Sequence, residues 1–320
     1  MKFILFSFLA FLFGTAGVFA QSHSTEFGAQ TDNDSYLLKG SDRYYTDGTF
    51  IYYRHALKIN GGDSTLLANK ILGFETGQKI FNPQSGFVPG PQYVDRPFAA
   101  YLYVGSTLNL LYKNESTLKL GAQLGVVGPA ALGEQVQKFI HQTFGFYPVG
   151  GWQYQIKNDV EINLSAEYNK LIARTSGLDV SFSGYANLGN GFTGAGAGPL
   201  VRIGLFNQLF HSVSTQSTTI RNETIAPLHR QEIFFYYKPQ FNYVAYDATI
   251  QGGLFEKHND PNSLEIVQTK EPFIFSQQFG IAFTTKRFVV DAAAIYHTKD
   301  VKEMVRKHQW GSITALYRFK

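Results

Sequence analysis

The stretch 160–168, VEINLSAEY, alternates apolar and polar side chains without a break. The even-numbered residues, from Val160 to Tyr168, are apolar, and the odd-numbered ones, including Glu161 and Glu167, are polar or charged. Because successive side chains of a strand point to opposite faces, the pattern predicts a β-strand with one apolar face. The same alternation recurs at 51–59, 180–188, 201–205, 273–283, 288–296 and 313–319. We therefore expect an all-β chain.

The composition narrows the class of protein. The 320 residues include no Cys, and aromatic and charged residues each make up 16%. Without Cys there can be no disulfide framework, thiolate metal site, Cys nucleophile or lipidated cysteine anchor. So many aromatics exclude a disordered chain. The formal charge of +4 is too small and diffuse to indicate a nucleic-acid partner.

The N-terminal residues predict a secretory signal peptide. Lys2 precedes an apolar run, 3–13, and 18–20 (VFA) resembles a cleavage site before Gln21. That run is shorter than the about 20 residues of a spanning helix, and no later segment approaches such a length. We expect 1–20 to be the signal peptide and 21–320 to form one domain, either soluble or a β-barrel.

Strand length distinguishes a transmembrane barrel from the alternative, a secreted β-sandwich. Several predicted strands run to ten or more residues, whereas strands of globular sheets average about five or six. A tilted strand that crosses a bilayer needs about 9–11 residues. Aromatic residues gather near strand ends, as at 50–53 and 234–237, which is typical of interfacial girdles. The barrel is favoured, with Glu161, Glu167 and Asp291 expected in its lumen.

We expect a 12-stranded antiparallel transmembrane β-barrel with a short helix in an extracellular loop. The predicted strands are 26–33, 46–59, 70–81, 97–112, 116–127, 155–171, 178–188, 198–207, 232–248, 272–285, 287–297 and 312–319. An even number places both termini in the periplasm. The outward connections are then 34–45, 82–96, 128–154, 189–197, 249–271 and 298–311. One inward connection, 208–231, is longer than expected.

Two outward loops carry candidate chemistry. The first contains Asp32, Asn33 and Asp34 and ends in 42–48, DRYYTDG. Its carboxylate and amide oxygens suit calcium, although these residue types also simply form turns. In the third, 134–144 reads as a helix that carries His141. A single His is more often structural than catalytic.

Other histidines and cations suggest less specific roles. His55 and His297 fall inside alternating strands, where a place in the lumen or a girdle is expected. A basic cluster in the last outward loop would face lipopolysaccharide phosphates or simply be solvated; it comprises Lys299, Lys302, Arg306, Lys307 and His308.

Four motifs occur in order at compatible spacings. They are 32–36 (DNDSY), 42–48 (DRYYTDG), 95–99 (DRPFA) and the region from Gly128-Pro129 through Gln137 and His141 to 151–155 (GWQYQ). Together they resemble the outer-membrane lipid A 3′-O-deacylase family. The resemblance covers the N-terminal half well, and the C-terminal half mainly as barrel strands.

This resemblance implies a calcium-dependent (Ca2+) carboxylic ester hydrolase in the outer membrane of a Gram-negative bacterium. The substrate would be lipid A of lipopolysaccharide, and outer-membrane lipid would surround the barrel. The active site would face the outer leaflet, between the barrel wall and a loop helix. No obligatory protein partner is evident. Two alternatives remain: a non-catalytic outer-membrane channel or surface-binding barrel, and a phospholipid esterase.

The family's functional residues fall on four positions of this sequence. The resemblance implies catalytic roles for His141, Asn33, Asp34 and Thr46, with Asp34 and Thr46 at the metal. His141 would be the general base that activates water. Calcium held partly by Asp34 would polarise the ester carbonyl. Asn33 and Thr46 would orient ligands or substrate.

One departure from the family concerns an acid. Its characterised members carry an essential Glu a few residues after the His, whereas 142–148 (QTFGFYP) has no carboxylate. Either another acid substitutes for it, for example Asp42, Asp47 or Glu134, or activity is altered. Asp95 and Arg96 match a family motif, and we expect them to hold the rim together by an ion pair.

Overall fold

The structure, a computed structural model, describes residues 23–38, 42–60, 65–221, 225–256 and 262–319. The predicted signal peptide, 1–20, lies outside the described residues and stays a prediction. No described helix has the length and apolar character needed to cross a membrane.

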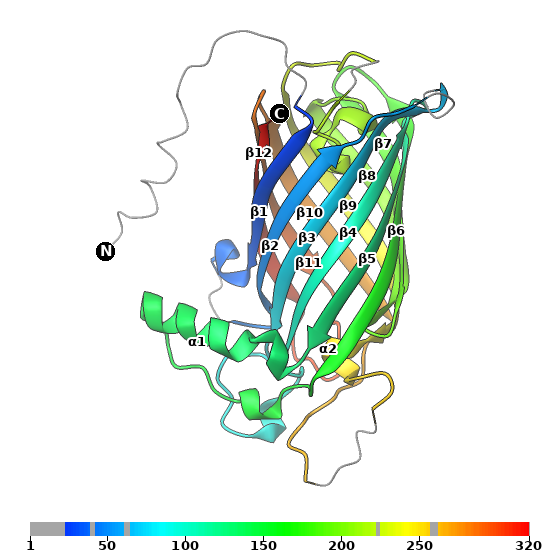
Figure 1. Cartoon of the computed structure of the whole chain (residues 1–320). Helices are drawn as coiled ribbons and strands as arrows, with labels where there is room; N and C mark the ends of the chain where they lie inside the picture. The colour runs from blue at the N-terminus through cyan, green and yellow to red at the C-terminus, as the bar shows by residue number, and fades with distance from the viewer. Residues whose placement is uncertain (1–22, 39–41, 61–64, 222–224, 257–261, 320) are drawn as a thin grey trace.

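Twelve strands of the described chain form one closed antiparallel barrel (Figure 1). Their bounds are β1 Thr25–Asn33, β2 Tyr45–Ala56, β3 Leu67–Phe81, β4 Ala99–Tyr112, β5 Ser116–Val127, β6 Asp159–Arg174, β7 Leu178–Gly189, β8 Phe192–Leu205, β9 Glu232–Asp247, β10 Phe273–Thr284, β11 Phe288–His297 and β12 His308–Phe319. Each strand pairs with the next in sequence, and β1 pairs with β12, so no strand edge is left unpaired. The predicted fold class is confirmed.

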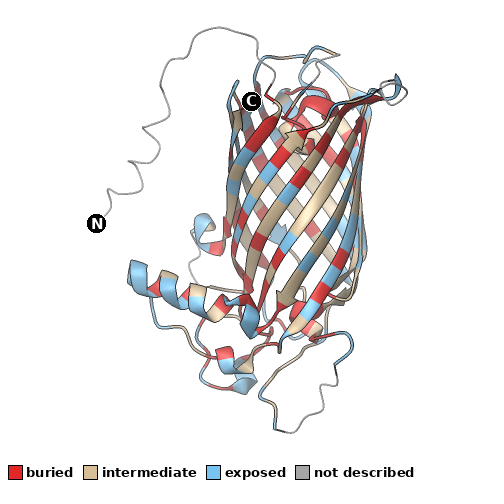
Figure 2. Cartoon of the chain, in the orientation of Figure 1, coloured by how far each residue is buried: buried red, intermediate tan, exposed pale blue. Residues whose placement is uncertain are grey.

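The alternation that predicted β6 has a direct structural counterpart. Val160 and Ile162 expose 62% and 63% of their surface on the outside, while Glu161 between them is fully buried. Buried and exposed residues alternate along the strands in the same way (Figure 2). An outer wall of this kind needs a lipid surrounding, because water would leave its apolar side chains unfavourably solvated.

Some strand ends differ from the prediction, because backbone pairing extends beyond the apolar alternation. β12 begins at His308, four residues before the predicted start, because His308 pairs with His297 of β11. β8 begins at Phe192, where small residues carry no alternation but the backbone pairs with β7 and β9. Conversely, the predicted start of β6 at 155 is loop, and Ile156 donates its N–H to the Phe98 carbonyl instead.

Short helices occupy the connections. Among the described residues, the α-helices are α1 Gly133–Phe144 and α2 Ala248–Gln251, and the 3-10 turns are η1 Asp34–Leu37, η3 Pro91–Tyr93, η4 Pro129–Ala131, η5 Trp152–Tyr154, η6 Leu209–His211 and η7 Val213–Thr215. The predicted helix 134–144 is confirmed as α1. It ends at Gly145, whose φ of 71° is left-handed and therefore favours glycine.

We call the end of the barrel where β1 begins and β12 ends the terminal end, and the opposite end the loop end (Figure 1). Residues 206–220 of the long connection between β8 and β9, named the plug segment, fold across the terminal end. Side chains from β3, β4, β8 and β12 donate to it: Asn69 Nδ2 to Thr219 O (2.7 Å), Asn109 Nδ2 to Thr215 O (2.9 Å), Arg202 Nη1 to Ser212 Oγ (2.8 Å) and Arg318 Nη1 to Thr218 O (2.9 Å). This explains the unexpected length of the connection and argues against an open channel.

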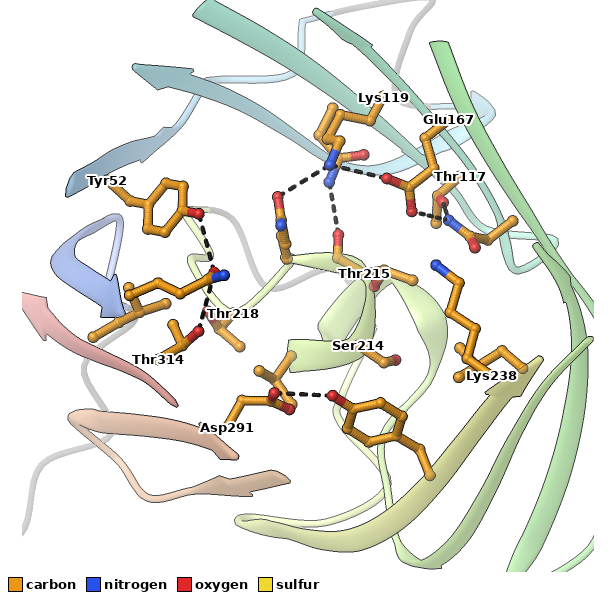
Figure 3. A pocket seen from close by; sticks show the side chains of 18 of the residues that line it. Tyr52, Thr117, Lys119, Glu167, Ser214, Thr215, Thr218, Lys238, Asp291 and Thr314 are labelled. Carbon is orange, nitrogen blue, oxygen red and sulfur yellow. Dashed lines mark hydrogen bonds and ion pairs between the residues drawn. The ribbon is translucent and has the colours of Figure 1, made fainter. Parts of the chain in front are cut away.

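A polar cavity of about 230 Å³ lies in the lumen beside the plug segment (Figure 3). Glu167 and Asp291 line it as predicted, the first paired with Lys119 Nζ at 3.0 Å and the second accepting from Tyr236 Oη at 2.9 Å. Such pairing satisfies charges that the barrel wall removes from bulk water. The lumen at this end is therefore polar, with its charged groups paired.

Candidate active site

The four predicted site residues come from four elements at the loop end. Asn33 ends β1, Asp34 begins η1 and Thr46 is the second residue of β2. Asn33 pairs with Asp47 in the β1–β2 register, which places the two strand ends side by side. His141 reaches the same place from the last turn of α1, which packs on β3 and β4.

Local hydrogen bonds hold the β1–β2 side of the site. The Asn33 side chain accepts from the Ser35 N–H at 2.8 Å, which caps η1, and donates to Asp47 Oδ1 at 2.5 Å. Asp34 accepts from the Arg43 N–H at 2.9 Å. Thr46 Oγ1 lies 3.5 Å from Asp34 Oδ1 and is fully buried. The structure thus brings Asn33, Asp34 and Thr46 together.

His141 is buried between α1 and the rim. Its Nδ1 lies 2.6 Å from the Tyr147 carbonyl oxygen, and its Nε2 lies 2.9 Å from Asp42 Oδ2. A carbonyl can only accept, so the Nδ1 of this pair carries the proton. The other ring nitrogen, Nε2, faces the Asp42 carboxylate.

Asp42 connects His141 to the β1–β2 residues. Its Oδ2 also accepts from the Tyr147 hydroxyl, and its Oδ1 accepts from Thr46 Oγ1 at 3.3 Å. Asp47 instead bonds to Asn33, and Glu134 pairs with Lys138 on an exposed face of α1. Of the three acids considered as substitutes for the absent Glu, Asp42 contacts the histidine.

Negative charge is concentrated at this rim. Burial raises the pKa of Asp34 to about 7, and the charges of Asp42 and Asp47 add to the shift, against the opposing hydrogen bond from Arg43. A divalent cation would relieve this repulsion. Asp34, Asp42 and Asp47, together with the Thr46 hydroxyl, form an oxygen cluster that offers only hard oxygen donors, the type that calcium prefers. The residues present therefore fit a calcium ion.

The contacts that hold α1 in place are not evident from the sequence. Trp152 Nε1 donates to Gln137 Oε1 at 2.9 Å, and both side chains are buried. A Cβ at Gly133 would lie 2.4 Å from the Ala100 Cβ, so glycine allows the helix to begin against β4. The i, i+4 spacing of Gln137 and His141 indicates that they share one face of the helix. The partner of Gln137, Trp152, lies outside the helix and follows from no local pattern.

Asp95 and Arg96 hold the rim through separate partners. Asp95 accepts from Tyr44 Oη at 2.8 Å and from the backbone N–H groups of Gln84 and Val305. Arg96 donates to Thr249 Oγ1 at 3.0 Å, and its guanidinium carbon lies 4.0 Å from the centroid of the Phe81 ring. The expected ion pair is not found among the described residues; each side chain instead joins the rim through hydrogen bonds to other loops.

A family model described as "Outer membrane protein LpxR" matches residues 4–319. The chain belongs to the LpxR family. This confirms the family predicted from the four motifs and supports the general function of an outer-membrane lipid A deacylase, with lipid A as substrate.

The solved structure of LpxR from Salmonella typhimurium has the same fold as this LpxR-family chain. Its TM-score is 0.73 at 21% identity, and the match covers 92% of this chain and 100% of that one. The β domain of the Bordetella autotransporter BrkA matches at a TM-score of 0.46 and 11% identity, over 93% and 99% of the two chains. No curated protein matches the chain.

Proposed function

We propose that this LpxR-family barrel hydrolyses an acyl ester of lipid A, with His141 as general base and with calcium required. The supporting observation is that one carboxylate, Asp42, contacts both His141 Nε2 and Thr46 beside Asp34. A candidate base and an oxygen-rich cluster are thereby joined in one site.

The surroundings of α1 suit an acyl substrate. Leu132, Phe139, Phe144 and Phe146 each expose about half or more of their surface on or next to this helix. α1 itself is amphipathic, with Gln137 and His141 on its buried face. An amphipathic helix with exposed Phe and Leu side chains is typical of a membrane interface. The loop end would therefore lie at the outer leaflet, where lipid A is found.

The mechanism follows from the two ring nitrogens of His141. Nδ1 is held by the Tyr147 carbonyl. In the reactive complex a water molecule takes the place of Asp42 Oδ2 at Nε2, and Nε2 accepts a proton from it as the water oxygen attacks the ester carbonyl. Asp42 stabilises the imidazolium formed in this step. When the tetrahedral intermediate collapses, the sugar oxygen leaves and receives that proton. The products are a fatty acid and a sugar hydroxyl.

Asp34 and Thr46, with Asp42 and Asp47 close by, are the residues that would hold calcium. When bound, such an ion supplies a Lewis acid for the ester carbonyl and positive charge for the oxyanion. Asn33 positions Asp47 through its 2.5 Å hydrogen bond and caps the turn that carries Asp34.

The test is mass spectrometry of lipid A and phospholipids from cells that express the wild type, His141→Ala or the matched control His229→Ala. His229 lies near the terminal end, next to Asn207. We expect loss of an acyl chain from lipid A with the wild type and with the control, and intact lipid A with His141→Ala. Unchanged lipid A in every sample would contradict the proposal, and loss confined to phospholipid would favour a phospholipid esterase.

A further inference from the structure

A second group of potential metal ligands lies at the loop end of the lumen. His297 is the last residue of β11 and His308 the first of β12, and the two pair directly in the strand register. Asp300 lies between them in the connection 298–307. One ligand atom from each of the three residues falls within 4.8 Å of the others. None of the three belongs to the candidate active site.

The hydrogen bonding of this group is incomplete. His297 Nδ1 lies 3.5 Å from Asp300 Oδ1, and His308 Nδ1 lies 3.6 Å from Asp300 Oδ2. Both distances exceed the 2.7–3.2 Å of ordinary N–H···O bonds. Across the described part of the chain, Asp300 Oδ1 and both ring nitrogens of His308 are among the buried atoms without a hydrogen-bond partner. His308 is only 5% exposed, so a partner for its ring nitrogens has to be held inside the lumen.

These separations suit a bridging metal better than direct bonding. Zinc bonds to nitrogen and oxygen of about 2.0–2.2 Å place neighbouring ligand atoms of a tetrahedron roughly 3.4 Å apart. The observed 3.5 Å and 3.6 Å, each to a different oxygen of Asp300, are within a few tenths of that value, and no separation within the group exceeds 4.8 Å. Two imidazoles and one carboxylate are a ligand set that zinc uses, whereas calcium prefers oxygen donors.

The surroundings hold the rings in place and favour a cation. His308 stacks on Trp310 with ring centroids 4.9 Å apart, and His297 meets the same indole edge-on at 4.7 Å. The three residues line a lumen cavity of about 550 Å³, which leaves space for a further ligand such as water. The other charged residues that line this cavity are Asp32, Asp247, Lys79 and Arg96. These four balance, so Asp300 leaves one net negative charge when the histidines are neutral.

The connection that carries Asp300 is firmly attached to the rim. Val301 and Met304 are buried against Tyr44 and Ile250. The Asp300 carbonyl accepts from the Glu271 N–H at 2.8 Å, which fixes the backbone at the ligand itself. A metal here would therefore tie the β11–β12 connection to the loops beside the active site.

We propose that His297, Asp300 and His308 bind a zinc-class transition-metal ion that stabilises the loop end of the barrel. The fourth position faces the lumen cavity. The site is separate from the oxygen cluster at Asp34, and the proposal does not depend on the deacylase activity.

Zinc binding to the full barrel in detergent micelles tests the proposal. The protein is stripped with a chelator and given excess calcium to occupy oxygen sites, and zinc is then titrated against a chromophoric competitor. We expect one zinc per barrel in the wild type. Asp300→Asn and His297→Gln should each weaken zinc binding by more than about tenfold. Removing a residue that only hydrogen-bonds to a metal ligand already costs about tenfold to a hundredfold in affinity, and these two residues would be ligands themselves. Asp300→Asn preserves shape, and heat-modifiable gel mobility verifies that each variant is a folded barrel.

Two controls separate this site from others. His229→Gln removes a distant histidine, and Asp34→Asn removes the central acid of the proposed calcium site; both should bind zinc as the wild type does. Cobalt in place of zinc should give the visible absorption of a four-coordinate ion, lost in Asp300→Asn. Absence of stoichiometric zinc would overturn the proposal. So would zinc binding that Asp34→Asn abolishes and Asp300→Asn leaves intact, because the metal would then lie at the rim.

Discussion

Replacing Asp42 with Asn tests whether this acid substitutes for the Glu that the sequence lacks. The change preserves the size of the side chain and removes its charge. Asp42 Oδ2 lies 2.9 Å from His141 Nε2, and the side chains are 17% and 5% exposed. The imidazolium that forms during catalysis would lose its carboxylate partner, while the Tyr147 carbonyl would still hold Nδ1.

The expected loss follows from the strength of that contact. A hydrogen bond to a charged group contributes about 1.5–3 kcal/mol, and little solvent reaches this pair to weaken it. Since about 1.4 kcal/mol corresponds to a factor of ten in rate, kcat should fall roughly 10-fold to 150-fold. KM should change less, because the interaction strengthens mainly in the transition state.

The assay measures fatty acid released from lipid A in mixed micelles by purified Asp42→Asn across a calcium series. Saturating calcium is essential, because the Asp42 charge also acts on Asp34. Glu134→Gln is the matched control, since Glu134 pairs with Lys138 on the exposed face of α1; it should retain wild-type kcat. An Asp42→Asn rate within about twofold of wild type at saturating calcium would refute the reasoning.

Three further predictions concern the cation, pH and the barrel interior. Thr46→Val removes one oxygen donor from a buried position and should raise the calcium requirement without lowering the unfolding midpoint; an unchanged calcium curve would count against Thr46 as a ligand. Because burial raises the pKa of Asp34 to about 7, protons should compete with calcium below that pH. The calcium affinity should fall about tenfold per pH unit there and level off above it, as measured by calorimetry; a flat profile would contradict this. Arg202→Met removes the 2.5 Å partner of the buried Asp179 carboxylate, which keeps Arg174 at 3.1 Å. Urea unfolding should therefore show a loss below the about 3–5 kcal/mol of a fully broken buried pair, on the order of 2 kcal/mol, and no loss would argue that the pair is not needed.

Local sequence patterns predicted most of the fold. The alternation at 160–168 places Val160 and Ile162 outside and Glu161 inside, as β6 shows. The helical pattern at 134–144 became α1. Where the alternation fades, as in the Gly-Ala run of β8, strand bounds depend on pairing with neighbours, which a single sequence does not display.

The site was only partly predictable, because its decisive contacts join distant segments. Motifs predicted Asn33, Asp34, Thr46 and His141, and the structure brings them together. The hydroxyl of Tyr147 reaches Asp42 across 105 positions of sequence, and no local pattern indicates such a contact. His297 and His308 were likewise read as separate residues, since only the register of β11 and β12 pairs them.

The central claim is hydrolysis of an ester of lipid A by a water that His141 activates. The most direct measurement follows isotopically labelled water into the products of purified protein acting on lipid A with calcium, for the wild type and for His141→Asn. The account predicts one labelled oxygen in the carboxylate of the released fatty acid, none in the sugar hydroxyl, and no release by the variant. Label in the sugar hydroxyl, or undiminished release by His141→Asn, would contradict it.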